Sequence, residues 1–467
     1  KCGNLETTAC FWHLLEMNQR RRHSMHYQNL SDKYLIGKKD IEAECFHRQY
    51  YHIYRARVKL LRERIIFNSR LQLGSNIEAC RLTKAKKDGK ILVIGTIIKR
   101  VKLRPSILRN LAEEQLILPQ PVAEDKLIGE EDFVEFEDDD QIVRLSGDFD
   151  MDEFATGCVV GIYGVQLDNE IFEVSQVIWP SKAPQPTYPI LNDDRYVMFV
   201  SGFSFTGQAD KDAEKIFALD LLQKWLCGLL PLSETERDMV ERIIRLVVAG
   251  ESVAITEQGR EFTTAARYLI KNEECPNIEC IAHMDKFLSK ISSLLEVDVM
   301  PGLGDPSTYL MPQQPIHRAV FQMGSKHGKM LNLVTNPYQF SLEGIHIMGT
   351  SGECLSDLKR FTKKLDDIAL LSKILDWQHL APTIPDTVDG FPFVDRDPFI
   401  IESFPHILFA ANQLELSHAV VEYEGNRRTL LLSIPSFTRT FSVILVNLRN
   451  FEVVEHNFCV DKLICDS

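Results

Sequence analysis

Residues 201–207 (SGFSFTG) form the segment of the chain that most resembles a loop built to hold a phosphate group. They follow residues 196–200, a short apolar run typical of a buried strand, and ligands often bind just beyond such strands in α/β sheets. The spacing does not fit this chemistry, because the second glycine of a G-x-G-x-x-G turn is missing. Gly207 is followed by Gln208 and Ala209 rather than by Lys and Ser or Thr, so no nucleotide-phosphate loop is predicted.

Other residue types that could do chemistry are isolated. The signatures G-x-S-x-G and H-E-x-x-H do not occur. His317 and His346 have no second histidine or carboxylate at ligand spacing, so we interpret them as packed or exposed residues. Cys275 and Cys280 lack a second cysteine or histidine pair nearby, and a zinc site is not predicted there either.

Cysteine usage and hydropathy indicate the compartment. The chain has 11 scattered cysteines and no C-x-x-C pair, which favours buried free thiols in a reducing compartment, the cytosol or the nucleus. No apolar run approaches the roughly 18–20 residues that a membrane span requires. Residues 1–24 include three consecutive arginines but no apolar stretch, so a secretory signal is not predicted. We expect residues 1–24 to be an extension ahead of a natural start at Met25 (or Met17), and residues 1–40 to be a disordered leader.

The charge of the chain argues against a protein that wraps nucleic acid by itself. Its 467 residues include 66 acidic and 53 basic side chains, a formal net charge of −13, whereas phosphate binding requires an excess of Lys and Arg. The charges are uneven, with basic residues gathered in 47–109 and acidic ones in 130–140. We interpret the acidic run as a solvated edge or loop; a docking patch for a basic partner is the alternative.

The elements of the first half suggest a helix followed by a small barrel. From Tyr50, apolar residues recur at three- and four-residue steps through Leu61 and Ile65, which predicts an amphipathic helix. Its opposite face is basic and is interpreted as solvated or facing an acidic neighbour, with nucleic-acid binding as the alternative. Short β-rich runs then favour a barrel of the oligonucleotide-binding type, with a hairpin turn at 168–169. These predicted strands are residues 91–98, 142–145, 159–165 and 171–174.

The second half alternates strands with helices. The prolines at 180–189 indicate a linker and a domain boundary. Ser233 and Glu236 have the spacing of a capping box, which predicts the start of a helix. Strand–helix alternation indicates a layered α/β domain. The strands expected here are 196–200, 244–249, 297–300, 429–434 and 443–448, and the helices are 212–229, 263–271, 284–295 and 355–378.

Seven short motifs, in order along the chain, resemble the small (B) subunits of eukaryotic DNA polymerase delta, a branch of the alpha/delta/epsilon B-subunit family. Each motif alone is weak, but seven in the expected order are specific. They are FHRQYYHIY at 46–54, LRPSIL at 103–108, VDVMPG at 297–302, PQQPIH at 312–317, VTNPY at 334–338, GTSG at 349–352 and APTIPDT at 381–387.

The resemblance implies an α/β and α+β fold in which an oligonucleotide-binding (OB) barrel joins a calcineurin-like phosphoesterase domain. The expected divisions are a helical segment at 41–90, the barrel at 91–180 and an inactive phosphoesterase domain at 190–467. The implied role is non-catalytic: a nuclear subunit that binds the C-terminal metal-binding module of the polymerase delta catalytic subunit, together with the third and possibly fourth subunits. Contact with DNA would be mainly indirect, with no membrane and no cofactor.

Active phosphoesterases of this fold hold two metals with D-x-H, G-D-x-x-D, G-N-H-[DE] and G-H-x-H motifs. Only Glu251 and Asp305 remain as carboxylates at the corresponding places, and we interpret both as loop-capping or interface residues. No catalytic, cofactor-binding or metal-binding residue is therefore assigned. The alternatives are a divergent metal-dependent phosphoesterase or nuclease and, more weakly, a single-strand-binding module. The corresponding segments read Ser201-Gly202-Phe203, Gly250-Glu251-Ser252, Gly302-Leu303-Gly304-Asp305 and Ala410-Ala411-Asn412-Gln413.

Overall fold

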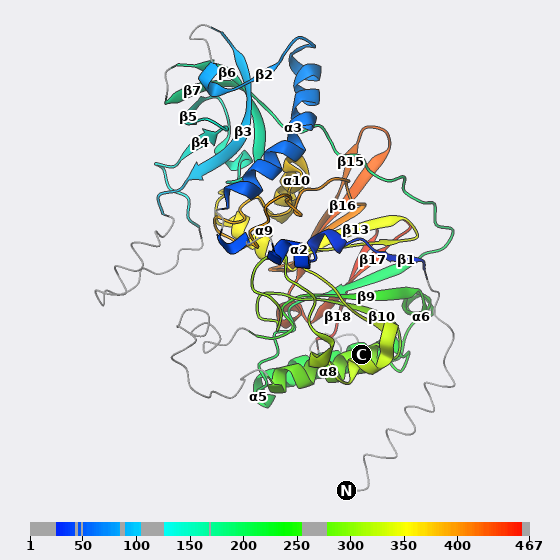
Figure 1. Ribbon diagram of the computed structural model, residues 1–467. Coiled ribbons are helices and arrows are strands. Elements are labelled where there is room, and N and C mark those ends of the chain that lie inside the picture. The colour runs from blue at the N-terminus through cyan, green and yellow to red at the C-terminus, as the bar shows by residue number, and fades with distance from the viewer. Residues whose placement is uncertain are drawn as a thin grey trace, which may run out of the picture.

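The computed structural model describes residues 25–42, 45–47, 50–84, 89–103, 126–167, 170–254 and 278–459. The chain forms a barrel, two stacked sheets below it, and helices on the outer faces of these layers (Figure 1). None of the helices among the described residues is long and apolar enough to cross a membrane. The helix predicted at 263–271 lies outside the described residues.

The barrel contains six strands in the order β2-β3-β4-β5-β7-β6, and it closes through an additional pairing of β3 with β6. This arrangement confirms the small barrel predicted from the sequence. β6 and β7 pair antiparallel, as expected for a hairpin, although the turn at 168–169 lies outside the described residues. The strands are β2 (Ala79–Cys80), β3 (Ile91–Arg100), β4 (Phe133–Glu137), β5 (Ile142–Gly147), β6 (Val159–Gln166) and β7 (Ile171–Ile178).

The first of the two stacked sheets, here called the β8 sheet, has the strand order β11-β10-β9-β8-β17-β18. Its four strands β8 to β11 run parallel, and β17 and β18 add an antiparallel edge. β9 is buried along its entire length, as a strand covered on both faces must be. The strands are β8 (Tyr196–Val200), β9 (Ile243–Ala249), β10 (Glu296–Met300), β11 (Leu331–Leu333), β17 (Ser442–Asn447) and β18 (Val453–Asn457).

The second sheet, here called the β13 sheet, has the order β1-β12-β13-β14-β16-β15. It packs face to face on the β8 sheet through a continuous apolar core in which the rings of Phe199 and Phe409 lie 5.1 Å apart. The strands are β1 (Tyr27–Asn29), β12 (Tyr338–Leu342), β13 (Ile345–Thr350), β14 (Ile407–Gln413), β15 (Ser417–Tyr423) and β16 (Arg427–Pro435).

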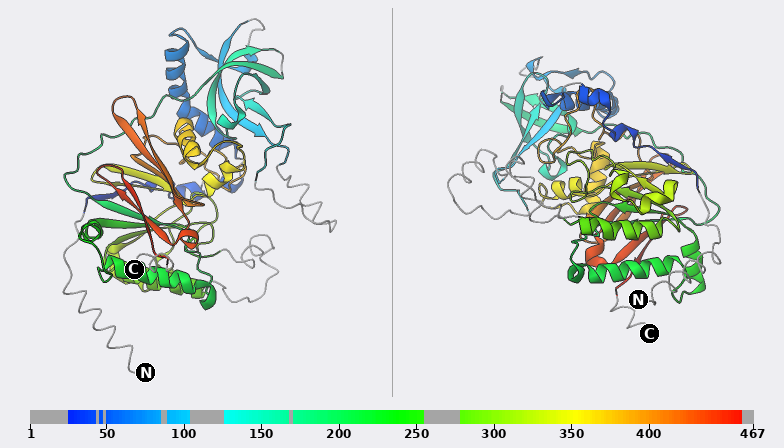
Figure 2. Two further views of the ribbon diagram at one scale, coloured as in Figure 1. Left: turned by 180° about the vertical axis from the view of Figure 1, so that it is seen from behind. Right: turned by 60° about the horizontal axis from the view of Figure 1, so that its bottom comes forward.

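Helices cover the outer faces of both sheets. α5 and α8 lie against the β8 sheet, and Figure 2 shows them side by side at the end of the molecule opposite the barrel. α6 begins with the predicted capping box of Ser233 and Glu236. The helices are α2 (Lys38–Glu42), α3 (Tyr51–Leu73), α5 (Ala209–Leu226), α6 (Glu234–Glu241), α8 (Ile278–Ile291), α9 (Glu353–Lys359), α10 (Asp367–Trp377) and α11 (Phe437–Thr440).

The prediction of one helix over 355–378 is wrong, because the chain forms two helices there. Between α9 and α10, side chains from the barrel domain bond to backbone groups that a continuous helix would pair internally. Lys99 donates to the Phe361 carbonyl at 2.6 Å, and Asp152 accepts from the amide of Lys363. Asp366 then caps the start of α10 by accepting from the amide of Ala369. One apolar core runs without interruption from the barrel interior to α9, α10 and the β13 sheet.

The expectation of a disordered leader through residue 40 is wrong for the part of it that the structure describes. β1 pairs antiparallel with β12, so that Tyr27 lies opposite Leu342. Tyr34 has no exposed surface. A three-residue strand has too little sequence to show a period, which is why the pattern of the sequence did not reveal it. Residues 1–24 lie outside the described residues.

Arg57 on α3 joins the barrel to the segment that follows α10. Its guanidinium is 0% exposed and donates to the carbonyls of Gly157 in the barrel and of Pro382 and Ile384 beyond α10, at 2.8 to 3.0 Å. Its Nε donates to Asp397 at 2.8 Å. A Cβ on Gly157, whose φ is +88°, would lie 2.0 Å from the Pro382 carbonyl oxygen, so only glycine permits this close approach.

His379 completes this buried cluster and is neutral at physiological pH. Its Nε2 lies 2.8 Å from Asp397, and its Nδ1 accepts from the amide of Ala381. Burial and the Arg57 charge lower the pKa of His379 to about 4. Burial acts to raise the pKa of Asp397, yet His379 and Arg57 together hold it well below its ordinary value.

Replacing Arg57 with Ala should lower the free energy of unfolding by about 3–5 kcal/mol, because it removes the cation paired with a buried carboxylate and the donor to three carbonyls. Urea denaturation followed by tryptophan fluorescence measures this change. The matched control is Arg55→Ala, an exposed arginine on the same helix, for which we expect a change within about 0.5 kcal/mol. Equal effects of the two substitutions would contradict the role given to Arg57.

Candidate functional site at the strand ends

The loops that follow the parallel strands of both sheets meet at one place. The amide of Gly202, after β8, donates to the carbonyl of Gly250, after β9, at 3.0 Å. The side-chain amide of Asn412, at the end of β14, donates to the carbonyls of Ala249 and Ser351 at 3.1 and 2.7 Å. The structure therefore brings together the segments at which the sequence placed a possible phosphoesterase site.

The strand-end loops approach one another so closely that two of their positions require glycine. Gly250 has a φ of +82°, and a Cβ there would lie 2.5 Å from the Cβ of Ser351. A Cβ on Gly302 would lie 2.3 Å from the amide nitrogen of Glu251. Larger side chains would push the loops apart, so the glycines fix how closely β9, β10 and β13 can end beside one another.

Asp305 holds the loop after β10. Its carboxylate accepts from the amides of Gly302 and Val253, at 2.8 and 3.0 Å, and so ties two strand-end loops together. The side chain is buried, and burial raises its pKa to about 7 even though the backbone amides act in the opposite direction. These hydrogen bonds agree with the interpretation of Asp305 as a loop-capping residue.

Glu251 faces a hollow instead of capping a loop. Its backbone has a φ of +54°, a conformation that few residues other than glycine adopt. With Glu353, Gln313, Tyr309 and others it lines a cavity of about 340 Å³. Burial, and then the charges of Glu353 and Asp305, raise the pKa of Glu251 to about 7.

A network of uncharged polar groups, absent from the sequence-based assignment, lies beside these carboxyl groups. The amide nitrogen of the Asn336 side chain donates to Gln313 Oε1 at 2.8 Å and to Ser351 Oγ at 2.6 Å, with Glu353 also in reach. The amide of Ser351 donates back to Asn336 Oδ1. Three of the seven family motifs, at 312–317, 334–338 and 349–352, supply these residues, so the resemblance was the only signal that marked them.

The end of β8 has neither a carboxylate nor an imidazole. Ser201 donates to the Pro435 carbonyl and accepts from the amide of Asn412. Phe203 is fully buried, and its ring lies 5.2 Å from that of Phe287 and 5.4 Å from that of Phe437. This donor set does not fit the two metals of an active phosphoesterase. No group of three His, Cys, Asp or Glu in the part of the chain that the structure describes could hold a metal ion.

The isolated histidines and cysteines lie elsewhere. His317 accepts from the amide of Ala319 and caps a short 3-10 turn. The ring of His346 lies 5.9 Å from that of His406, and burial lowers the pKa of His346. Cys280 is buried on α8, while Cys275 lies outside the described residues. Cys158, Cys280 and Cys354 are buried free thiols, as predicted, whereas Cys80, Cys227 and Cys459 are free thiols that are only partly buried.

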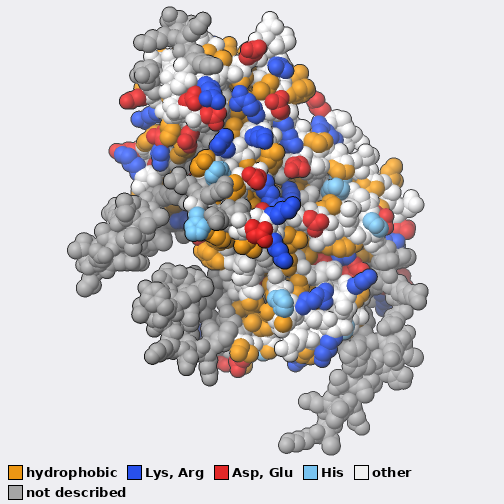
Figure 3. Space-filling model, viewed as in Figure 1, with side chains coloured by type: hydrophobic (Ala, Val, Ile, Leu, Met, Phe, Trp, Pro, Cys, Tyr) orange, Lys and Arg blue, Asp and Glu red, His pale blue; other side chains and the backbone are white. Residues whose placement is uncertain are grey.

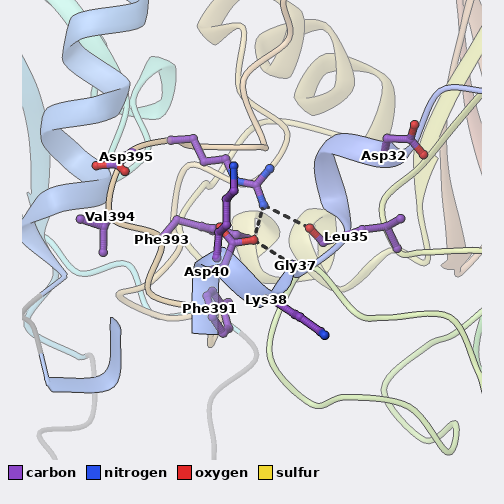
Figure 4. A pocket seen from close by; sticks show the side chains of 11 residues that line it. Asp32, Leu35, Gly37, Lys38, Asp40, Phe391, Phe393, Val394 and Asp395 are labelled. Atoms are coloured by element: carbon purple, nitrogen blue, oxygen red, sulfur yellow. Dashed lines mark hydrogen bonds and ion pairs between the residues drawn. The ribbon is translucent and has the colours of Figure 1, made fainter. Parts of the chain in front are cut away.

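A second hollow, of about 550 Å³, lies between residues 32–40 and 391–396 (Figure 4). Asp40 accepts from Arg396 at 2.9 Å and from the amide of Gly37 at 2.8 Å. The guanidinium of Arg396 also lies over the ring of Phe393. Asp40 and Arg396 thus pair with each other, and their bond joins α2 to the 391–396 segment. We therefore interpret this region as a structural contact.

Comparisons with known proteins match both the barrel and the part of the chain that forms the two sheets. A family model described as DNA polymerase delta subunit OB-fold domain matches residues 49–177, and one that describes the B subunit of DNA polymerase alpha/epsilon matches residues 197–419. The probable DNA polymerase delta small subunit of Caenorhabditis elegans is 34% identical over 449 residues, which cover 93% of this chain and 97% of that protein. The chain belongs to the family of DNA polymerase delta small subunits.

Other members of the family extend across animals and plants. DNA polymerase delta subunit 2 of Drosophila melanogaster is 31% identical over 93% of this chain and 98% of its own length. The DNA polymerase delta small subunit of rice is 30% identical over 92% of this chain and 97% of its own length. The delta small-subunit match thus spans both the barrel and the sheets.

Glu251→Gln should raise the melting temperature at pH 8 and lose that gain at pH 5. A carboxyl group whose pKa is about 7 when folded, against an ordinary value of 4.5, stabilises the fold at low pH. That contribution is lost as the pH rises through 7, and Gln avoids the loss because it does not ionise. Thermal melts at both pH values measure the effect, with the exposed Glu424→Gln as control. An equal shift at pH 5 and pH 8 would contradict this account.

Proposed function

We propose that this chain is a non-catalytic accessory subunit of the DNA polymerase delta complex. Its role is to hold the catalytic subunit, through that subunit's C-terminal metal-binding module, together with the third and possibly fourth subunits during strand elongation and repair synthesis. The proposal rests on family membership across nearly the whole chain, and it places the protein in the nucleus, where replication takes place.

The observation that most strongly supports a non-catalytic role is the chemistry of the strand ends. Metal-assisted hydrolysis needs several N and O ligands that converge on two ions and activate a water molecule. Here Phe203 is packed among aromatic rings, Asp305 is engaged by backbone amides, and Asn412 bonds to backbone carbonyls. We infer that residues 190–467 are a phosphoesterase-like domain with a degenerate metal site.

The proposed domain organisation follows from the same features. Residues 91–180 are the OB barrel, preceded by the helical segment at 41–90, and residues 190–467 are the phosphoesterase-like domain. Residues 180–189 contain no helix or strand, yet Ala183 is buried and Gln185 donates to the carbonyls of Pro405 and Arg428. A fixed connection of this kind suits a scaffold, because it presents both parts to partners in one orientation.

Co-expression with the C-terminal region of a delta-type catalytic subunit should raise the soluble yield and the melting temperature of this chain. A partner that binds only the folded state stabilises it by mass action. Size-exclusion chromatography should show the two proteins co-eluting. A chain that is equally stable alone and does not co-elute at micromolar concentration would refute the proposed function.

The purified chain should hydrolyse neither phosphodiesters nor phosphomonoesters in the presence of Mn²⁺. Chromogenic esters of both kinds measure this, with an active calcineurin-like phosphoesterase as positive control. A rate above background that disappears in both Glu251→Ala and Asp305→Ala would favour the alternative, a divergent metal-dependent phosphoesterase or nuclease.

A further inference from the structure

α3 exposes an apolar stripe along its C-terminal half. Leu60, Phe67 and Leu71 are 45%, 59% and 69% exposed. Their spacing of seven and four residues places them on one side of the helix. The opposite side, with Leu61 and Ile65, is fully buried against β3, β6 and β7. The stripe therefore belongs to a face that the barrel does not use, and it is about 16 Å long at 1.5 Å per residue.

Exposed basic residues follow one edge of this stripe. Lys59 and Arg70 are exposed, and neither forms an ion pair with a residue that the structure describes. Glu63 is the acidic residue on the same side. Figure 3 shows Lys and Arg side chains gathered over the region of α3, with hydrophobic side chains among them.

The other edge of the stripe is held in place. Arg64 donates to the carbonyl of Ile401 at 3.0 Å and to that of Glu402 at 3.0 Å, and it also bonds to Gln378. Asn68 donates to the carbonyl of Trp179 at 2.8 Å. These bonds fix the rotation of α3 about its own axis, so the exposed face is presented rigidly. A preorganised face loses little conformational entropy when a partner binds.

We propose that this face of α3 is the docking surface for an amphipathic helix of another subunit, apolar on one side and carrying Asp or Glu along one edge. A helix laid along α3 would cover three apolar side chains spaced over about three turns, by the same packing that joins helices within proteins. The acidic edge would meet Lys59 and Arg70. This inference rests on the proposed function, because it assigns one surface to the assembly role.

Charge and composition favour a protein helix over DNA as the occupant. Phosphate groups would be attracted to the basic edge, but Leu60, Phe67 and Leu71 would gain nothing from them. Burying an exposed aromatic and two leucines against an apolar helix face removes their surface from water, which stabilises the core of a protein interface. The basic edge then sets the orientation of the partner and speeds its association.

The test uses the full chain co-expressed with the catalytic and other accessory subunits of polymerase delta from one organism. Phe67→Glu combined with Leu71→Glu should weaken, about tenfold or more, the retention of one subunit, while the remaining subunits stay bound. The control is Leu414→Glu, which changes a leucine that is 62% exposed at the β14–β15 turn. It should retain every subunit. Melting temperatures establish that each variant is folded.

A second variant tests the electrostatic contribution to this binding separately. Lys59→Glu combined with Arg70→Glu should weaken retention of the same subunit, and it should make that binding less sensitive to added salt than the wild type. Because these side chains are exposed, this variant keeps the proposal testable even if the first one unfolds. Full retention of all subunits by both variants would overturn the proposal.

Two other outcomes would also overturn it. If the variants keep all subunits but lose affinity for a labelled single-stranded or double-stranded oligonucleotide, α3 is a DNA-binding face. If the wild-type chain itself retains no subunit, then the proposed function fails first, and the inference about α3 fails with it. The wild-type arm therefore distinguishes failure of the assembly role from failure of this particular surface.

Discussion

A guanidinium with no exposed surface fixes the barrel relative to the sheets. Arg57 can lose its hydration only because three carbonyls and one carboxylate accept hydrogen bonds from four of its five N–H groups. Burying such a charge is costly unless the geometry is complete. The cluster therefore forms only when α3, the barrel and residues 379–397 are all in place, and this makes their arrangement cooperative. The continuous apolar core supplies most of the stabilisation through the hydrophobic effect, but this effect is non-directional and does not by itself fix the orientation of the barrel.

The parts of the fold that could be predicted are those in which one residue pattern decides the local structure. β3, β8 and β9 are mostly apolar runs, and their positions were evident from hydropathy. β15 was missed because none of its side chains is buried and its polar and apolar residues do not alternate regularly. The break between α9 and α10 was also missed, since it depends on Lys99 and Asp152, which are distant in sequence.

Some features of the candidate site could likewise be predicted from the sequence, and others could not. The absence of carboxylate and imidazole side chains at the ends of β8 and β14 could be read from the sequence, because residue type alone decides it. The network of Asn336, Gln313 and Ser351 could not, since uncharged polar residues are common and acquire meaning only when the fold brings them together. Likewise, the amphipathic pattern of α3 predicted one buried side, but it did not reveal that Arg57 belongs to that side.

The pairing of β1 with β12 also constrains the order in which the chain can fold during synthesis. β1 leaves the ribosome before the other strands that the structure describes, yet the strand that receives it follows about 300 residues later, with Tyr27 opposite Leu342. At typical rates of translation this interval is roughly 15–60 s. During that time the edge of the β13 sheet does not exist, and the residues of β1 must remain unpaired or be protected by a chaperone. The earliest residues that the structure describes are thus among the last to reach their native neighbours.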